Sequence, residues 1–364
     1  MKRVLKILGF TLLGIIVLAS IAAIVYAFLP KGPREPMTFE DPTGLPREPI
    51  VARSYAAVTG SPWATRAATR ILEGGGNAYD AAVAALLMLN VTNGEAASFP
   101  GIAPTMIYDA ATGTTHSYIG AGTAPGAATI ELYTDQGHET VPDLNILTQL
   151  LPASPDVIVR MLADYGTLSF AEVSRDAIAR ARTGFPVTET MAKNLDFSLL
   201  ERIGFSIILR YNAKVYLKGE WWRPIHEKDR FTRPDLADTW EAMVEAERSA
   251  LESGATRISA LRAVRDYFYE GPLADAIIAL HERRDGLFAP EDLASYAGGW
   301  EEPMVGSYNE YTFHTNQSWT QGITVLLVQP NFAQAVWHVY DPDGNPLTLV
   351  VEGDVSGHAI EGTA

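Results

Sequence analysis

The chain has 364 residues, 47% of them hydrophobic, and carries a formal net charge of −15 with a sequence pI near 4.9. A chain of this length and hydrophobic content can bury one large core or two smaller ones. The acidic balance argues against a nucleic-acid partner, because affinity for nucleic acid comes largely from Lys and Arg side chains that neutralise phosphates. The lack of cysteine excludes disulfides, thiolate nucleophiles and Cys-based metal centres. The seven histidines form no HExxH motif, so neither a metal nor another cofactor is predicted.

The N-terminus carries a membrane signal. A basic tail, residues 1–6, precedes an uncharged apolar run at 7–29, which exceeds the roughly 20 residues that a spanning helix needs. The sequence VYA at 25–27 resembles a signal-peptidase site, although the run is longer than the ~7–15 residues of a usual signal core. A retained anchor is therefore favoured over a cleaved signal. The basic flank predicts a single-pass protein of the inner or plasma membrane, with a cytoplasmic N-terminus and a periplasmic or other extracytoplasmic body after a Pro-rich linker at 30–50.

The most distinct element of the body is a buried helix. An amphipathic run at 62–73 stops at three glycines, 74–76, which suit a helix C-terminus. Asn77 is a favoured N-cap, and Asp80 adds negative charge to the first turn of the next helix. Residues 78–89 are almost wholly apolar, so no polar face remains and the helix should lie in the core of a layered domain.

The remaining pattern is mixed. Strand-like stretches are 51–59, 304–315 and 322–328, and hairpins are predicted for 105–108 with 116–119 and for 335–340 with 346–351 around a DPDGN turn. Helical spacing occurs at 155–165, 169–182, 187–200, 234–252, 259–268, 272–283 and 290–296. This order predicts an α+β or layered α/β class.

Four stretches, in this order, resemble segments of the γ-glutamyltranspeptidases, members of the N-terminal-nucleophile hydrolases. They are SPWATRAATRIL at 61–72 with GGNAYDAAVA at 75–84, GFPV at 184–187, PDLADT at 234–239 and FYEGPLADAI at 268–277 with its continuation to Tyr296. The resemblance implies an α+β fold, the layered αββα sandwich, made in the family as a precursor that cuts itself into a large and a small subunit. It assigns residues 51–328 to a large-subunit-like domain and 329–364 to a remnant of the small subunit's first hairpin. Because most of the small subunit is missing after that hairpin, we expect an incomplete sandwich and a second protein chain that completes it.

In that family a threonine at the start of the small subunit attacks a γ-glutamyl amide, and its own α-amine serves as the base. Aligning the terminal hairpin on its DPDGN turn puts Gln334 at the nucleophile position, and Gln has no nucleophilic oxygen. The carboxylate-binding arginine corresponds to Ala121, which cannot bind that group. The polar residues that help to hold the substrate fall near Glu352 and Asp354, where negative charge would repel an α-carboxylate.

The family's oxyanion turn corresponds to residues 317–322, QSWTQG, in which one glycine is left and Trp319 is inserted. If this alignment is shifted, Thr320, Thr324 or Thr348 becomes a candidate for a displaced nucleophile. Each of these is also an ordinary strand residue, since threonine is favoured in strands.

Two functional hypotheses follow. The first is a membrane-anchored, γ-glutamyltranspeptidase-like protein that lacks the usual nucleophile and is non-catalytic or depends on a partner chain. The second is an exported γ-glutamyl hydrolase or transferase, acting on glutathione or other γ-glutamyl small molecules, with a displaced or partner-supplied nucleophile. A truncated gene product is the third reading of the same pattern.

Overall fold

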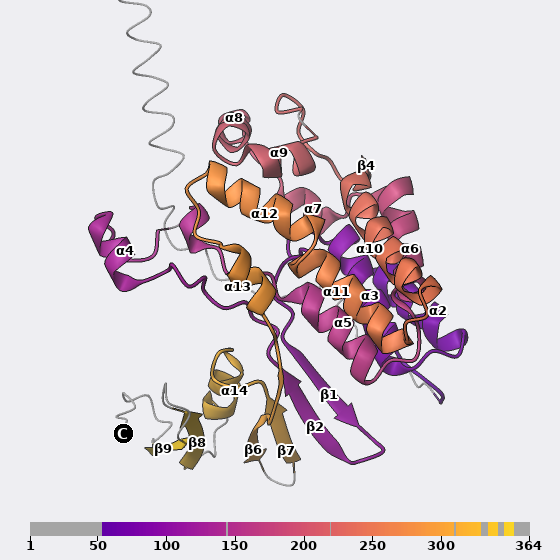
Figure 1. Ribbon diagram of the computed structural model, residues 1–364. Coiled ribbons are helices and arrows are strands. Elements are labelled where there is room, and N and C mark those ends of the chain that lie inside the picture. Colours follow the sequence, from indigo (N-terminus) through magenta and orange to yellow (C-terminus); the bar gives the residue numbers. More distant parts are fainter. Residues whose placement is uncertain are drawn as a thin grey trace, which may run out of the picture. The chain divides into compact units, whose positions relative to one another are not determined.

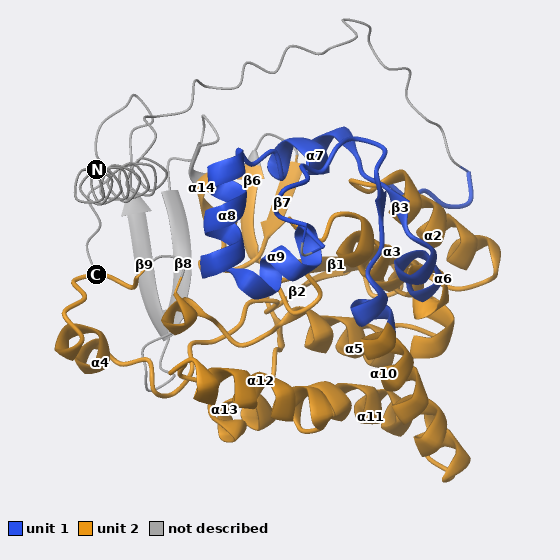
Figure 2. Cartoon of the chain, turned by 90° about the horizontal axis from the view of Figure 1, so that it is seen from above, with its two compact units in different colours: residues 1–58, 178–237 blue, residues 59–177, 238–364 orange. Residues whose placement is uncertain are grey.

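A computed structural model of the chain describes residues 53–142, 145–218, 220–308, 311–328, 334–340 and 346–352. The chain divides into two compact units, Met1–Val58 with Ile178–Ala237 (unit 1) and Thr59–Ala177 with Asp238–Ala364 (unit 2), as coloured in Figure 2. The predicted anchor at 7–29, the linker at 30–50 and Asp354 lie outside the described residues. Among the helices of the described part, none combines the length and the apolar character needed to cross a bilayer.

Unit 2 contains most of the helices. They are α2 (Pro62–Glu73), α3 (Ala78–Thr92), α4 (Ile130–Asp135), the 3-10 turn η1 (Ile146–Thr148), α5 (Ser154–Asp164), α11 (Arg257–Tyr269), α12 (Pro272–Arg283), α13 (Pro290–Ser295) and α14 (Gly322–Val328). Two further helices, α6 (Phe170–Thr183) and α10 (Pro234–Glu252), each run from one unit into the other. Within unit 2, α2 packs on α3, α3 on α5 and α5 on α11 (Figure 1).

The buried helix predicted from the sequence is α3. Asn77 caps it, with its Oδ1 accepting from the N–H groups of Tyr79 and Asp80 at 3.0 Å, and Asp80 Oδ2 accepts from the Asn77 N–H in return. This capping box satisfies N–H groups that the first turn would otherwise leave unpaired. Ten of the fifteen residues of α3 are buried, which confirms the inference from its lack of a polar face.

Asp80 does more than complement the helix dipole. It is fully buried, and its carboxylate also accepts from the Thr167 N–H at 2.9 Å, the Thr167 hydroxyl at 2.7 Å and the Leu168 N–H at 3.1 Å. From the other side, Arg257 of α11 donates to the carbonyl oxygens of Leu162 and Leu168. Asp80 therefore satisfies hydrogen-bond donors of the segment between α5 and α6, and Arg257 satisfies carbonyl acceptors of the same region.

Short antiparallel pairs make up the sheets. In unit 2, β1 (Thr105–Asp109) pairs with β2 (Thr114–Tyr118), which also pairs with β5 (Trp300–Glu301), and Figure 1 shows the β1–β2 hairpin extending from the helices. The other pairs are β6 (Met304–Tyr308) with β7 (Tyr311–Thr315), and β8 (Gln334–Tyr340) with β9 (Pro346–Glu352). In unit 1, β3 (Phe185–Pro186) pairs with β4 (Arg230–Phe231). Both predicted hairpins are confirmed.

Several sequence predictions need correction. Residues 322–328 form helix α14 and not a strand, 304–315 form two strands and not one, and 53–59 contain no strand. A short apolar run such as GITVLLV does not distinguish helix from strand by periodicity. The predicted helix at 187–200 is α7 (Glu189–Asn194), which ends before Ser198 caps α8 (Leu199–Ile208). The helix α9 (Arg210–Tyr216) follows, and the sequence had not indicated it.

The role of Asp80 is testable by substitution. We expect Asp80→Asn to lower the free energy of unfolding by about 2–3 kcal/mol, because an amide cannot accept all the bonds that the buried carboxylate accepts. The matched control is Asp176→Asn, which breaks a half-exposed ion pair with Arg70 and should cost about 1 kcal/mol or less. Urea denaturation of the purified full chain measures both. Equal losses in the two variants would contradict the assignment.

Candidate active site

The terminal hairpin brings two predicted site positions together. Strand β8 begins at Gln334, and the register pairs Gln334 with Glu352, the last residue of β9. Their backbones are therefore direct neighbours at one end of the hairpin. The nucleophile position of the resemblance stands at the start of a strand, opposite a position assigned to substrate binding.

Ala121 lies in the segment that follows β2, in tightly packed backbone. The N–H of Ala103 donates to the Gly120 carbonyl at 2.8 Å, and the N–H of Leu151 donates to the Thr123 carbonyl at 2.9 Å. A Cβ at Gly120 would stand 2.0 Å from the Ala103 oxygen, and one at Gly122 would stand 1.7 Å from the Leu151 oxygen. The segment is thus fixed on both sides, although the Ala121 methyl group has no charge to offer a carboxylate.

The turn at 317–322 uses its own hydrogen-bonding groups. The Thr320 N–H and the Thr320 hydroxyl both donate to the Gln317 carbonyl, at 3.0 and 3.2 Å, and the Gly322 N–H donates to the Thr320 Oγ1 at 3.2 Å. An oxyanion hole requires N–H groups that point at the position of the developing charge. Here the Thr320 and Gly322 N–H groups are engaged inside the turn that leads into α14.

Trp319 is held by a network that the sequence did not reveal. Glu301 Oε1 on β5 accepts from the Trp319 indole N–H at 2.8 Å and from the Ser117 hydroxyl at 2.9 Å. The Asn316 amide donates to Ser117 Oγ at 2.8 Å and to the Thr105 carbonyl at 3.2 Å. The turn is therefore tied to all three strands of the β1–β2–β5 sheet. No spacing pattern connects residues so far apart in the chain.

A buried ion pair supports the same region. Arg265 of α11 donates to Asp156 Oδ1 of α5 at 2.7 Å, and Asp156 Oδ2 accepts from the Tyr118 hydroxyl at 2.5 Å and from the Gly298 N–H at 3.0 Å. Arg265 also donates to the carbonyl oxygen of Tyr296. Because Asp156 has 1% of its surface exposed, its charge is compensated almost entirely by these partners.

The tyrosines around this pair remain protonated at neutral pH. Burial, followed by the charge of Asp156, raises the pKa of Tyr118 well above its usual value and that of Tyr296 to about 12. The Tyr296 hydroxyl donates to the Ala121 carbonyl at 3.2 Å, so the ion pair and Ala121 are two contacts apart. In the described ranges, no group of three or more His, Asp or Glu side chains is arranged to hold a metal ion.

The family model for gamma-glutamyltranspeptidase matches residues 64–342. The chain belongs to the γ-glutamyltranspeptidase family. It is similar to the glutathione hydrolase-like YwrD proenzyme of Bacillus subtilis, with 28% identity over 72% of this chain and 46% of the relative. A glutathione hydrolase proenzyme of Pseudomonas aeruginosa is 27% identical over 70% of this chain and 41% of its own length.

The fold is similar to the solved structure of Helicobacter pylori gamma-glutamyltranspeptidase. The TM-score is 0.65 at 26% identity, and the match covers 77% of this chain and 75% of that one. The resemblance inferred from four short stretches is therefore confirmed, together with a mixed α/β fold of the γ-glutamyltranspeptidase type. The chain spans less than half the length of the two proenzymes above.

The Asp156–Arg265 pair gives a second stability test. We expect Asp156→Asn to lower the free energy of unfolding by about 3–5 kcal/mol, because it leaves the Arg265 charge buried without a counter-charge. Tyr118→Phe should cost about 1–2 kcal/mol, since it removes one hydrogen bond to a charged group. Arg160→Gln, in a half-exposed pair with Asp164, is the control and should change the value by about 0.5 kcal/mol or less. Chemical denaturation measures the loss of unfolding free energy in all three variants. A loss in Asp156→Asn no larger than that in the control would contradict the importance of the buried pair.

Proposed function

We propose that this γ-glutamyltranspeptidase-family chain lacks the usual threonine nucleophile and is non-catalytic by itself, serving as a subunit that works with a second chain. The observation that carries the proposal is the register of the terminal hairpin, in which the strand opens on Gln334 opposite Glu352. A primary amide offers no oxygen that could form a γ-glutamyl ester. A carboxylate on the opposite strand would repel the α-carboxylate of a γ-glutamyl substrate.

Changes at other positions support the same conclusion. Ala121 supplies no cation, and the turn at 317–322 engages its Thr320 and Gly322 N–H groups internally. Nucleophile, carboxylate clamp and oxyanion donors act as one unit in acyl transfer, so losing several of them removes more activity than any single loss. Restoring one group by Gln334→Thr should therefore leave the chain inactive.

The candidates for a displaced nucleophile fit structural roles. The Thr320 hydroxyl donates to the Gln317 carbonyl and accepts from the Gly322 N–H, so its oxygen is part of the turn. Thr324 lies in the first turn of α14, and Thr348 lies inside β9 opposite His338. A γ-glutamyl hydrolase or transferase whose nucleophile comes from the partner is the second candidate.

The proposed second chain follows from the family's architecture. The curated relatives are proenzymes, and the two compared above extend well beyond the part that this chain matches. We assign residues 51–328 to a large-subunit-like domain and 329–364 to a remnant of the small-subunit hairpin. A second chain would then supply the strands and helices that complete an αββα sandwich, because uncovered sheet edges and faces are unfavourable in water.

The proposal also includes the membrane. The apolar run at 7–29 is assigned to a single-pass anchor of the inner or plasma membrane, with the body on the extracytoplasmic side, on the strength of its length and its basic flank.

Catalysis is tested on the full chain purified from membranes. We expect one species near 39.5 kDa, and turnover of γ-glutamyl p-nitroanilide no higher than that of Gln334→Ala, because no nucleophilic hydroxyl is present to accept the γ-glutamyl group. Thr320→Ala serves as the matched control for a displaced nucleophile. A new threonine amino terminus, or a covalent glutamyl adduct that Thr320→Ala abolishes, would disprove the non-catalytic assignment.

The second chain is tested by purification in mild detergent from the native source, followed by mass photometry. We expect a complex with a stoichiometric partner. A stable monomer that keeps its solubility would count against an incomplete sandwich, because such a chain would have no uncovered sheet.

A further inference from the structure

A short stretch of unit 1, made of α8, α9 and the loop after α9, exposes several large apolar side chains. We call it the α8–α9 patch; its members are Leu199, Leu200, Ile207, Ile208, Tyr211, Trp221 and Trp222. Ile207 has 73% and Trp222 60% of its surface exposed. A cluster of this kind marks an interaction site, because isolated apolar residues are common on surfaces but grouped ones are not.

The patch is preformed. Ser198 and Glu201 build a capping box that starts α8. Arg202, which is buried, donates through Nε to the Trp221 carbonyl at 2.8 Å and also contacts the Phe197 carbonyl. The two tryptophans are therefore tied to the helix that carries the exposed leucines and isoleucines. The patch needs little rearrangement to bind a partner, which lowers the entropic cost of docking.

The charge around the patch is opposite to that of the whole chain. Residues 199–230 contain seven Lys and Arg residues and four Asp and Glu residues, a net charge of +3 in a chain of −15. Arg210 and Lys214 are exposed four residues apart on α9. Among the described residues of this stretch, the ion pairs use Arg223, with Asp229, and Lys228, with Glu227. Arg210 donates to the Tyr211 hydroxyl at 3.0 Å, and neither Arg210 nor Lys214 takes part in those ion pairs.

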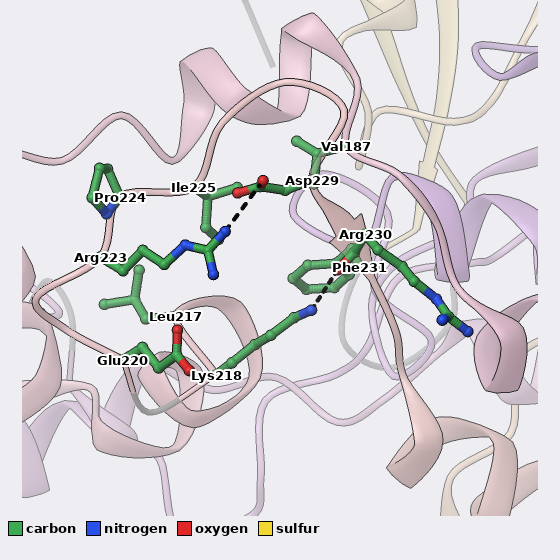
Figure 3. A pocket seen from close by; sticks show the side chains of 10 residues that line it. All are labelled: Val187, Leu217, Lys218, Glu220, Arg223, Pro224, Ile225, Asp229, Arg230 and Phe231. Carbon is green, nitrogen blue, oxygen red and sulfur yellow. Dashed lines mark hydrogen bonds and ion pairs between the residues drawn. The ribbon is translucent and has the colours of Figure 1, made fainter.

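Two more cations flank the tryptophans. Lys218 and Arg223 both line a cavity of about 240 Å³, where Arg223 is paired with Asp229 (Figure 3). Lys218 has the left-handed backbone angle φ of 51° that non-glycine residues rarely adopt. Its amine donates to the Arg230 carbonyl at 2.6 Å and lies 5.2 Å from the centre of the Phe231 ring. Glu220 and Asp229 also line this cavity, so its mixed charge does not favour tight binding of an anion.

We propose that the α8–α9 patch docks on the surface of an anionic lipid bilayer. Tryptophan and tyrosine rings favour the headgroup level, and Lys and Arg keep their charges in water while their stems lie along apolar surface. The exposed leucines and isoleucines lie on α8, the basic residues on α9 and the tryptophans in the loop that follows. Apolar and basic side chains combined in this way are typical of segments that lie in a membrane interface. Each Lys or Arg near an anionic leaflet adds to the attraction.

The absence of cysteine allows a clean test. In the full chain, Ile207→Cys carries the environment-sensitive dye NBD, and the control is Ile258→Cys on α11 of unit 2, where the native side chain is 45% exposed. The vesicles contain phosphatidylcholine with or without phosphatidylglycerol. We expect a blue shift at position 207 and its quenching by brominated lipid, larger with phosphatidylglycerol and reduced by salt. Position 258 should not change.

Charge variants complete the design. Arg210→Gln combined with Lys214→Gln should abolish the difference between the two vesicle types while leaving the far-UV circular dichroism unchanged. If the chain co-floats with vesicles but the dye at position 207 shows no blue shift, the chain is anchored elsewhere and the docking proposal is wrong. A blue shift that appears without lipid and grows with protein concentration would assign the patch to a second copy of the chain. A shift that needs an added partner protein would likewise overturn the proposal.

Discussion

The buried carboxylate of Asp156 joins the helices of unit 2 to its sheet. It is bonded to Arg265 of α11, to Tyr118 of β2 and to the Gly298 N–H just before β5. A Cβ at Gly298 would stand 2.6 Å from the Tyr118 ring and 2.8 Å from the carboxylate, so the close approach requires glycine. A charge with 1% exposure is tolerated only with such partners. Moving α11, β2 or the segment before β5 away from α5 would therefore leave a buried charge without its partners.

This constraint connects the scaffold to the candidate site. Arg265 contacts the Tyr296 carbonyl, and the Tyr296 hydroxyl reaches the Ala121 carbonyl. The turn at 317–322 is likewise bonded to the sheet through Glu301, Ser117 and Asn316. In the described residues, the buried side-chain atoms without a hydrogen-bond partner belong to other segments, among them Asn90, Ser154 and Trp240. The bonds of this turn therefore make it a structural connection between the β1–β2–β5 sheet and α14.

Local rules explain what the sequence predicted and what it did not. The helix α3 was predictable because its cap, its first-turn acid and its apolar run are adjacent in the chain. The GITVLLV segment was assigned wrongly to a strand, because seven apolar residues fit either structure and the bonds of the turn before it favour a helix. Contacts such as Asp156 with Arg265, 109 positions apart, leave no periodic trace. The positions of the candidate site came from resemblance, and their bonding required the structure.

The two units place different physical demands on the surroundings. Unit 2 stabilises its buried charges internally, whereas the α8–α9 patch of unit 1 leaves apolar rings and basic groups facing outward. An acidic chain close to an anionic leaflet is repelled, but the repulsion is screened beyond about 8–10 Å at physiological salt. A local excess of positive charge therefore determines which face can approach that closely, and the exposed tryptophans and isoleucines gain burial only after it has done so. Positive charge brings the α8–α9 patch to the anionic leaflet, and burial of its apolar side chains then stabilises the bound state. Both features are therefore needed in the same stretch of chain.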